Sequence, residues 1–198
     1  MEKLPSDFTY DKYGIHARFV TEDDAEFIIK LRTDPRLTRF IHDTDSDVQK
    51  QREWIRNYKV REAEGKEYYF VVSNNGIPAG LIRIYNIHDK VFTVGSIIMD
   101  KEAPIHCALA ATIMAKEIAF ETLDLELEDT FDGVHVDNKQ VVKLSLSWGK
   151  KEYRRFQDVK GEYIAFHLTK GDYLNVKPKK VRQLQLIIGE NEYKINNQ

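Results

Sequence analysis

The first third of the chain changes from strand periodicity to helical periodicity. Apolar and polar residues alternate over 13–20, which is typical of a β-strand. Thr21 precedes a run of acidic residues and is a good helix N-cap, and Asp34-Pro35 breaks the helix that it starts. In order, the predicted segments are a polar lead-in at 1–12, a strand over 13–20, a helix to about Leu31, a loop or short helix over 36–45, and a helix over 47–64 that Gly65 ends.

Three consecutive strands are predicted in the middle of the chain. They cover residues 68–72, 81–87 and 90–99. The Asn75-Gly76 pair between the first two is a strong hairpin signal, and a short turn at His88-Asp89 leads to the third. An Ala-rich helix is then expected from Pro104, because proline is favourable at the first helical position.

The last third of the chain is less regular. The predicted segments are a strand over 125–136 that Gly133 weakens, a helix capped by Asp137-Asn138 and ended by Gly149, and strand segments over 156–169. Beyond Lys170 the pattern is poor, and Leu184 to Ile188 is a candidate edge strand or partner contact. This predicts an N-terminal extension at 1–12, one domain over 13–170, and a C-terminal extension at 171–198.

Length and composition limit the class of protein. A chain of 198 residues suits one domain with short extensions, since domains average about 150 residues. Lys and Arg number 30 against 32 Asp and Glu, so nucleic-acid binding is not expected. No apolar stretch approaches the ~20 residues that span a bilayer, and no signal peptide is recognised. One cysteine excludes an internal disulfide and a cysteine-rich zinc site, which favours a cytoplasmic protein without a metal.

The junction between the strand at 90–99 and the Ala-rich helix is a candidate ligand site. Backbone N–H groups in the first turn of a helix have no partner within the helix, and the helix dipole adds positive potential there. A phosphate group can bind at such a helix start. Phosphate-binding turns are normally rich in glycine, but none occurs between Asp100 and Ala110.

Three segments carry a resemblance to a known family. V-G-S-I-I-M-D resembles its fourth strand, A-K-E-I-A-F the end of its cofactor helix, and V-H-V-D-N-K-Q-V-V-K-L-S-L-S-W-G the strand and helix that finish its site. Together with the order of predicted elements, they resemble the GNAT acetyltransferase superfamily over roughly 13–170. The resemblance implies an α/β (α+β) fold, with a mixed, mostly antiparallel central sheet flanked by about four helices. It also implies acetyl transfer from acetyl-CoA to an amine.

The resemblance further implies where acetyl-CoA binds. The family's phosphate loop runs Gln/Arg-x-x-Gly-x-Gly/Ala, and Ala103, His106 and Ala108 stand where Arg, the first Gly and Gly/Ala belong. Only Ala108 conforms, and a side chain at His106 is expected to crowd a pyrophosphate bound to the backbone. Family geometry also places backbone N–H groups of 95–99 beside the thioester. The residues assigned to the cofactor are Ile97, Ile98, Met99, His106, Cys107, Ala108 and Asn138.

Acetyl transfer to an amine needs a neutral amine, a stabilised oxyanion and a thiolate that can leave. An alkyl amine has a pKa near ~10.4, so a base or a water chain must take its proton. Asp132, His135 and Glu128 are the nearest candidates, although a lone histidine or carboxylate at a strand end is more often a solvated or hydrogen-bonded surface group. Ser145 falls where many relatives place a tyrosine that protonates the thiolate, and Lys150 where an aromatic residue usually follows the glycine.

Arginine and aromatic residues are expected on the acceptor face. Arg36, Trp54, Arg83 and Tyr85 are the candidates, because arginine matches phosphate and aromatic rings stack on sugars and bases; singly, each could also be a loop charge or a core residue. R-T-D-P-R-L-T-R-F-I is similar to enzymes that acetylate aminosugar nucleotides and to ribosomal-protein alanine acetyltransferases. Three functions stay open: acetylation of a small-molecule amine, acetylation of a protein N-terminus, and a binding module without catalysis. The protein is also a candidate to form a homodimer.

Overall fold

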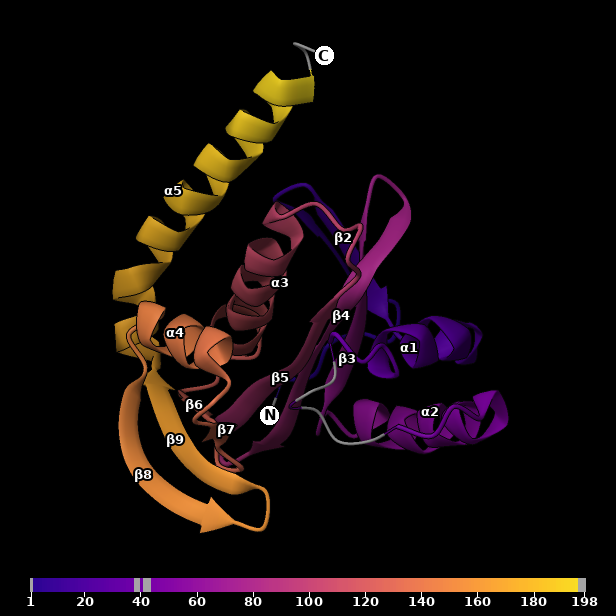
Figure 1. Ribbon diagram of the computed structural model, residues 1–198, viewed down its shortest axis with the longest axis horizontal. Coiled ribbons are helices and arrows are strands. Elements are labelled where there is room, and N and C mark those ends of the chain that lie inside the picture. The colour runs from indigo at the N-terminus through magenta and orange to yellow at the C-terminus, as the bar shows by residue number, and fades with distance from the viewer. Residues whose placement is uncertain (1, 38–39, 41–43, 196–198) are drawn as a thin grey trace.

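A nine-stranded sheet forms the centre of the computed structural model, which describes residues 2–37, 40 and 44–195 (Figure 1). The strands are β1 (Thr9–Lys12), β2 (Ile15–Phe19), β3 (Tyr68–Asn74), β4 (Ile77–His88), β5 (Val91–Met99), β6 (Leu127–Asp129), β7 (Val134–His135), β8 (Lys151–Asp158) and β9 (Gly161–Thr169). Their order is β1-β2-β3-β4-β5-β6-β9-β7, with β8 paired to β9. β5 and β6 pair in parallel, and the other printed pairs are antiparallel.

Helices cover both faces of this sheet. They are α1 (Ala25–Arg32), α2 (Val48–Ala63), α3 (His106–Glu117), α4 (Lys139–Ser147) and α5 (Lys170–Ile195), with a short 3₁₀ turn η1 (Glu22–Asp24) and a π turn η2 (Ile118–Thr122). α1 and α2 lie on one face, and α3 and α5 on the other (Figure 1). The predicted mixed fold with a mostly antiparallel sheet is confirmed. Within the described ranges, no helix is long and apolar enough to cross a membrane.

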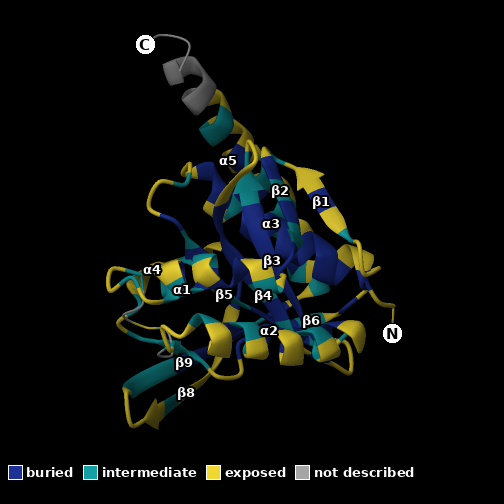
Figure 2. Cartoon of the chain, turned by 90° about the vertical axis from the view of Figure 1, so that its right-hand side faces the viewer, coloured by how far each residue is buried: buried dark blue, intermediate teal, exposed yellow. Residues whose placement is uncertain are grey.

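Strand β3 explains why the sheet carries two hydrophobic cores. Tyr68, Phe70 and Val72 belong to the core beneath α3, whereas Tyr69 and Val71 belong to the core beneath α1 and α2. Successive side chains of a strand point to opposite faces, so a continuous apolar run is required here. Figure 2 shows the resulting buried centre of the molecule.

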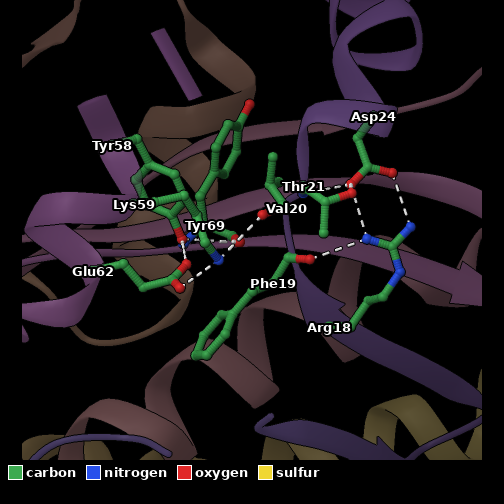
Figure 3. Close-up of polar contacts among 9 residues, drawn as sticks. All are labelled: Arg18, Phe19, Val20, Thr21, Asp24, Tyr58, Lys59, Glu62 and Tyr69. Atoms are coloured by element: carbon green, nitrogen blue, oxygen red, sulfur yellow. Dashed lines mark hydrogen bonds and ion pairs between the residues drawn. The ribbon is translucent and has the colours of Figure 1, made fainter. Parts of the chain in front are cut away.

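Polar contacts hold the segment before α1, and α2 itself, against strands of the sheet (Figure 3). Arg18 on β2 donates two hydrogen bonds of 2.8 Å to the Asp24 carboxylate, which also accepts one from the Thr21 backbone N–H at 2.7 Å. Thr21 thus precedes the first helical turn as predicted. The Tyr58 hydroxyl of α2 accepts a hydrogen bond of 2.8 Å from the backbone N–H of Tyr69. A contact to each of two neighbouring strands therefore anchors this helical layer.

Several predicted turns and helix ends are confirmed by their backbone angles. Asn75 and Gly76 have φ of 49° and 76°, as a two-residue hairpin turn requires. The Asn138 side chain accepts a hydrogen bond of 3.3 Å from Val141 and caps α4. Helix α3, in contrast, begins at His106 and not at Pro104. The turn before it is closed by a hydrogen bond of 2.9 Å from the Cys107 N–H to the carbonyl of Pro104.

The edges of the sheet differ from the prediction. β1 arises from the expected N-terminal extension and pairs with β2 around a turn with positive φ at Tyr13 and Gly14. The strand expected at 125–136 is divided into β6 and β7. The segment expected at 156–169 is the second arm of a hairpin, whose first arm, β8, is almost entirely exposed. Because both of its faces meet solvent, β8 shows no alternation of apolar residues.

The C-terminal segment is a helix. Residues 184–188, a candidate edge strand in the sequence, lie within α5, and Leu184 and Tyr173 are fully buried in the core that contains α3. The far turns of α5 extend beyond the sheet (Figures 1 and 2).

A polar cluster at the end of α3 connects the two ends of the chain. The Glu117 carboxylate accepts hydrogen bonds from the hydroxyls of Tyr10 at 2.5 Å and Tyr13 at 2.8 Å. Lys177 of α5 pairs with the same carboxylate at 2.8 Å. The β1–β2 hairpin and α5 are therefore both fastened to α3.

Candidate active site

The parallel strands β5 and β6 separate shortly after they meet. They pair only through Val91 with Leu127 and Phe92 with Glu128. A hydrogen bond of 2.7 Å from the Thr93 hydroxyl to the carbonyl of Asp129 is a further link between the two segments. Beyond it the edge of β5 has no paired strand among the described residues, and its pairing with β4 shifts next to Ser96, whose φ is 51°. A β-bulge of this kind bends the strand and increases its twist.

A cleft of about 1550 Å³ opens where the strands diverge. It is lined by Thr112 and Lys116 from the α3 side and by Arg32 and Tyr85 from the α1/α2 side, so it passes through the sheet. Its helical half is formed by β5, α3 and α4, and includes Ile97, Met99, Ala108, Ser145 and Trp148. Its hairpin half surrounds β7 and the β8–β9 hairpin, and includes Phe131, Asp132, Arg154, Phe156, Lys160 and Tyr163.

A buried group of three charged residues lies where the cleft begins, next to the paired part of β5 and β6. The Glu128 carboxylate binds Lys116 of α3 and Lys150, which follows α4, with both N···O distances at 2.5 Å. Glu128 is fully buried, and the lysines expose 2% and 8% of their surface. The Lys116 ammonium also lies 5.1 Å from the centre of the Trp148 ring. This Lys116–Glu128–Lys150 group joins α3, β6 and the segment that follows α4.

Burial and mutual attraction determine how this group titrates. Burial lowers the pKa of Lys116 to about 8, although Glu128 acts to raise it. Burial alone would raise the pKa of Glu128, but the two lysines hold that pKa below its ordinary value. Glu128 is therefore a carboxylate at neutral pH and an unfavourable general base, because both of its oxygens are engaged by ammonium groups.

The hairpin half combines a cation with aromatic rings. The Arg154 guanidinium lies 4.7 Å from the centre of the Phe131 ring and 4.5 Å from that of Phe156. Arg154 also donates a hydrogen bond of 2.7 Å to the carbonyl of Phe131. Tyr163 stacks on Phe156 with ring centres 5.6 Å apart. Planar rings and a guanidinium of this kind suit a base or a phosphate-bearing ligand.

His135 and Asp132 occupy the same half but differ in availability. The Nε2 of His135 lies 3.0 Å from the carbonyl of Lys160, and its Nδ1 accepts a hydrogen bond of 3.1 Å from the Asp137 N–H. Both nitrogens of a neutral imidazole are thereby used. Asp132 is exposed at the cleft. The pKa of Tyr85 is raised mainly because its hydroxyl is buried, and the negative charge of Asp132 is the next cause. Asp132 is therefore the better placed of the two to accept a proton.

Comparison with known proteins places the chain in a family. A family model described as an acetyltransferase (GNAT) domain matches residues 15–150. The chain belongs to the GNAT acetyltransferase family. The structure of apo FdhC, a nucleotide-linked sugar GNAT, is 31% identical, with a TM-score of 0.78 over 90% of this chain and 99% of FdhC.

More distant structures share the GNAT fold alone. Spermidine N-acetyltransferase SpeG from Vibrio cholerae is 18% identical, with a TM-score of 0.67 over 83% of this chain and 98% of its own. Ribosomal-protein-S5-alanine acetyltransferase from Vibrio fischeri is 13% identical, with a TM-score of 0.70 over 84% of this chain and 99% of its own. No curated protein matches the chain.

Most residues that the sequence assigned to a GNAT site line the cleft. These are Asp132, His135 and Ser145, the cofactor candidates Ile97, Ile98, Met99, Ala108 and Asn138, and the acceptor candidates Arg36 and Tyr85. Ser145 is buried on α4. Gly95 lies beside Tyr85, and a Cβ added at Gly95 would stand 3.0 Å from the Tyr85 ring.

His106 and Cys107 lie outside the residues that line the cleft. The His106 ring packs beneath Gly14, where a Cβ would come within 3.3 Å of its Nε2, and that nitrogen lies 3.3 Å from the Asn74 amide. The structure therefore turns the imidazole away from the cleft, contrary to the expectation that it crowds a bound pyrophosphate. Cys107 is fully buried in the core, and burial raises the pKa of its thiol.

Trp54 and Arg83 also lie outside the lining of the cleft. Trp54 stacks on Tyr58 of the same helix, with ring centres 5.8 Å apart. Arg83 pairs with Glu67 and lies 5.3 Å from the centre of the Trp54 ring. Both contribute to the layer between α2 and the sheet, and Arg83 reaches the site through its 5.0 Å contact with the Tyr85 ring.

Sequence reasoning missed the lysine group and the hairpin. Lys116 gave no signal, and Lys150 was recognised only as a departure from the family pattern. Arg154, Phe156 and Tyr163 are brought to the cleft by the β8–β9 hairpin. An alternation of Arg154, Phe156 and Asp158 along β8 was the available signal, since residues two apart share a face.

Proposed function

We propose that this GNAT protein transfers an acetyl group from acetyl-CoA to the primary amine of a nucleotide-linked amino sugar. The observation that carries the proposal is the 31% identity to a nucleotide-linked sugar GNAT over 90% of the chain. The arginine and aromatic lining of the hairpin half supports it, because a nucleotide offers a planar base and a diphosphate.

The helical half suits acetyl-CoA, which supplies the acetyl group as a thioester. The unpaired edge of β5 offers backbone N–H and C=O groups to the amides of a pantetheine arm. The first turn of α3 offers N–H groups to a diphosphate, and Ala108 provides a small side chain there. The His106 ring packs against Gly14 and Asn74 and does not line the cleft, which supports cofactor binding without a glycine at that position.

The residues around the junction of the two halves support direct transfer. In this mechanism the amine attacks the thioester carbonyl, and Asp132 takes the proton of the amine. Backbone N–H groups of β5 stabilise the oxyanion, because they are fixed before the reaction starts. Tyr85 packs against Gly95 and holds the acceptor side of β5 in shape.

The hairpin half supplies the contacts for the acceptor. Arg154 and Lys160 are cations that line the hairpin half together with its aromatic residues, and we assign them to the diphosphate. Phe131, Phe156 and Tyr163 are assigned to the base or sugar ring, on which aromatic side chains stack.

The assignment predicts a matched pair of variants. Arg154→Gln should raise the KM for a nucleotide-linked amino sugar about 10- to 100-fold, because a hydrogen bond to a charged group contributes about 1.5–3 kcal/mol. Arg155→Gln is the control, since Arg155 pairs with Glu152 and Glu162 and does not line the cleft. Equal KM values for both variants would contradict the assignment.

Cofactor binding is tested separately by isothermal titration with acetyl-CoA. The proposal predicts saturable binding and a thermal shift. No heat and no thermal shift at about millimolar cofactor, the upper end of usual KM values, would refute the enzyme and favour a binding module without catalysis.

A further inference from the structure

The Lys116–Glu128–Lys150 group carries more positive than negative charge. Two ammonium groups share one carboxylate, and all three residues are at least nine-tenths buried. An uncompensated charge is unfavourable in the interior, where opposite charges are normally paired. The surplus therefore points to a function that a simple one-to-one ion pair would not serve.

The other polar groups around Lys116 do not neutralise this surplus. Lys180 of α5 is buried and lies 5.5 Å from the centre of the same Trp148 ring that Lys116 contacts. Trp148 lines the cleft, and its indole N–H is buried without a hydrogen-bond partner in the described part of the chain. Besides Glu128, the charged groups that act on Lys116 are thus the two lysines Lys150 and Lys180, and the Trp148 indole beside it is a hydrogen-bond donor. Such surroundings favour an anion.

The position of the group indicates at which part of the cleft it would meet an anion. Glu128 belongs to the last paired register before β5 and β6 diverge, and the chain continues from it to Asp132 in the hairpin half. Lys116, Lys150 and Trp148 line the helical half. The group therefore lies where the two halves of the cleft meet, which is where donor and acceptor must react.

We propose that the Lys116–Glu128–Lys150 group uses its surplus positive charge to stabilise the thiolate of CoA, the anion that acetyl transfer produces at this junction. The inference rests on the proposed function. In the reaction a C–N bond forms and the C–S bond breaks, the electron pair stays on sulfur, and the amine proton goes to Asp132. The thioester is neutral and the thiolate is negatively charged, so the positive charge stabilises the thiolate, and the transition state that leads to it, more than it stabilises the thioester.

The titration of the thiol in bound CoA tests this directly. Ultraviolet absorbance of the thiolate should give a pKa at least about one unit below the ordinary thiol value of ~8.5. Lys116→Met leaves a one-to-one pair of Glu128 with Lys150, and should return the pKa of the bound thiol towards ~8.5. Cys107 is the one cysteine of the chain, and its pKa is raised by burial, so the protein without CoA provides a clean blank.

Control variants separate an electrostatic role from a structural one. Lys150→Met should return the pKa of the bound thiol towards its ordinary value as Lys116→Met does, and it replaces Lys116→Met in the experiment if that variant does not fold. Lys143→Met on the exposed side of α4 should leave the thiol pKa unchanged. Affinity for desulfo-CoA should change less than twofold in every variant, since it has no thiol.

The outcomes are distinguishable from those that test the proposed function. If CoA and desulfo-CoA both fail to bind, the proposed function falls, and this inference with it. If both bind, but the thiol pKa is ordinary in the wild type or unchanged in both lysine variants, only this inference is overturned.

Discussion

Removing the negative charge of Glu128 should destabilise the protein severely. In Glu128→Gln the side chain keeps its size, but two buried ammonium groups lose the carboxylate that both contact at 2.5 Å. Breaking a buried ion pair by removing one partner costs about 3–5 kcal/mol. A domain of this size changes its Tm by about 2–4 °C per kcal/mol, so the expected decrease is about 6–20 °C. With a total stability of about 5–15 kcal/mol, the loss is a large fraction.

Thermal and urea denaturation, compared with a matched variant, test this expectation. Glu126→Gln changes an exposed glutamate two positions earlier in the chain and should alter stability by less than about 0.5 kcal/mol. If the two variants have the same Tm, the buried carboxylate does not balance the lysines, and the account of the Lys116–Glu128–Lys150 group is wrong.

Three further predictions follow from individual contacts. Gly95→Ala places a Cβ 3.0 Å from the Tyr85 ring and should raise the KM of the acceptor, while the Kd for acetyl-CoA in isothermal titration stays the same. His106→Ala should lower the Tm, because the ring packs beneath Gly14, yet leave that Kd within about twofold; a tighter Kd would show that the imidazole obstructs the cofactor. Since the pKa of Lys116 is lowered to about 8, the folded protein binds fewer protons than the unfolded chain above that pH. The stability of the wild type relative to Lys116→Met, measured in urea, should therefore increase as pH rises from about 8 to 10, and a flat difference would contradict the lowered pKa.

Features specified by neighbouring residues could be predicted from the sequence. Asn75-Gly76 supplies the positive φ of a hairpin turn, and Asn138 caps the helix that follows it. The order of strands and helices around the cleft follows from such local signals. The cofactor candidates from 97 to 99 line the cleft because they lie on one short stretch of β5.

Features that depend on distant partners could not be predicted in this way. The direction of the His106 side chain is determined by space beneath Gly14, far away in the sequence. Lys116 lies on α3 and Lys150 follows α4, and the two meet only at Glu128, so no spacing identifies them as a group. The β8 strand is exposed on both faces, and its contribution to the cleft arises from pairing with β9.

A competition among acceptors tests the proposed function most directly. The protein is given acetyl-CoA with equal concentrations of a nucleotide-linked amino sugar, the same amino sugar without its nucleotide, spermidine, and a peptide that begins with alanine, and the acetylated products are measured by mass spectrometry. The account predicts acetylation of the nucleotide-linked sugar in clear preference to the other three, and loss of that preference in Arg154→Gln but not in Arg155→Gln. Preferred acetylation of the peptide or of spermidine, or equal acetylation of the sugar with and without its nucleotide, would contradict it.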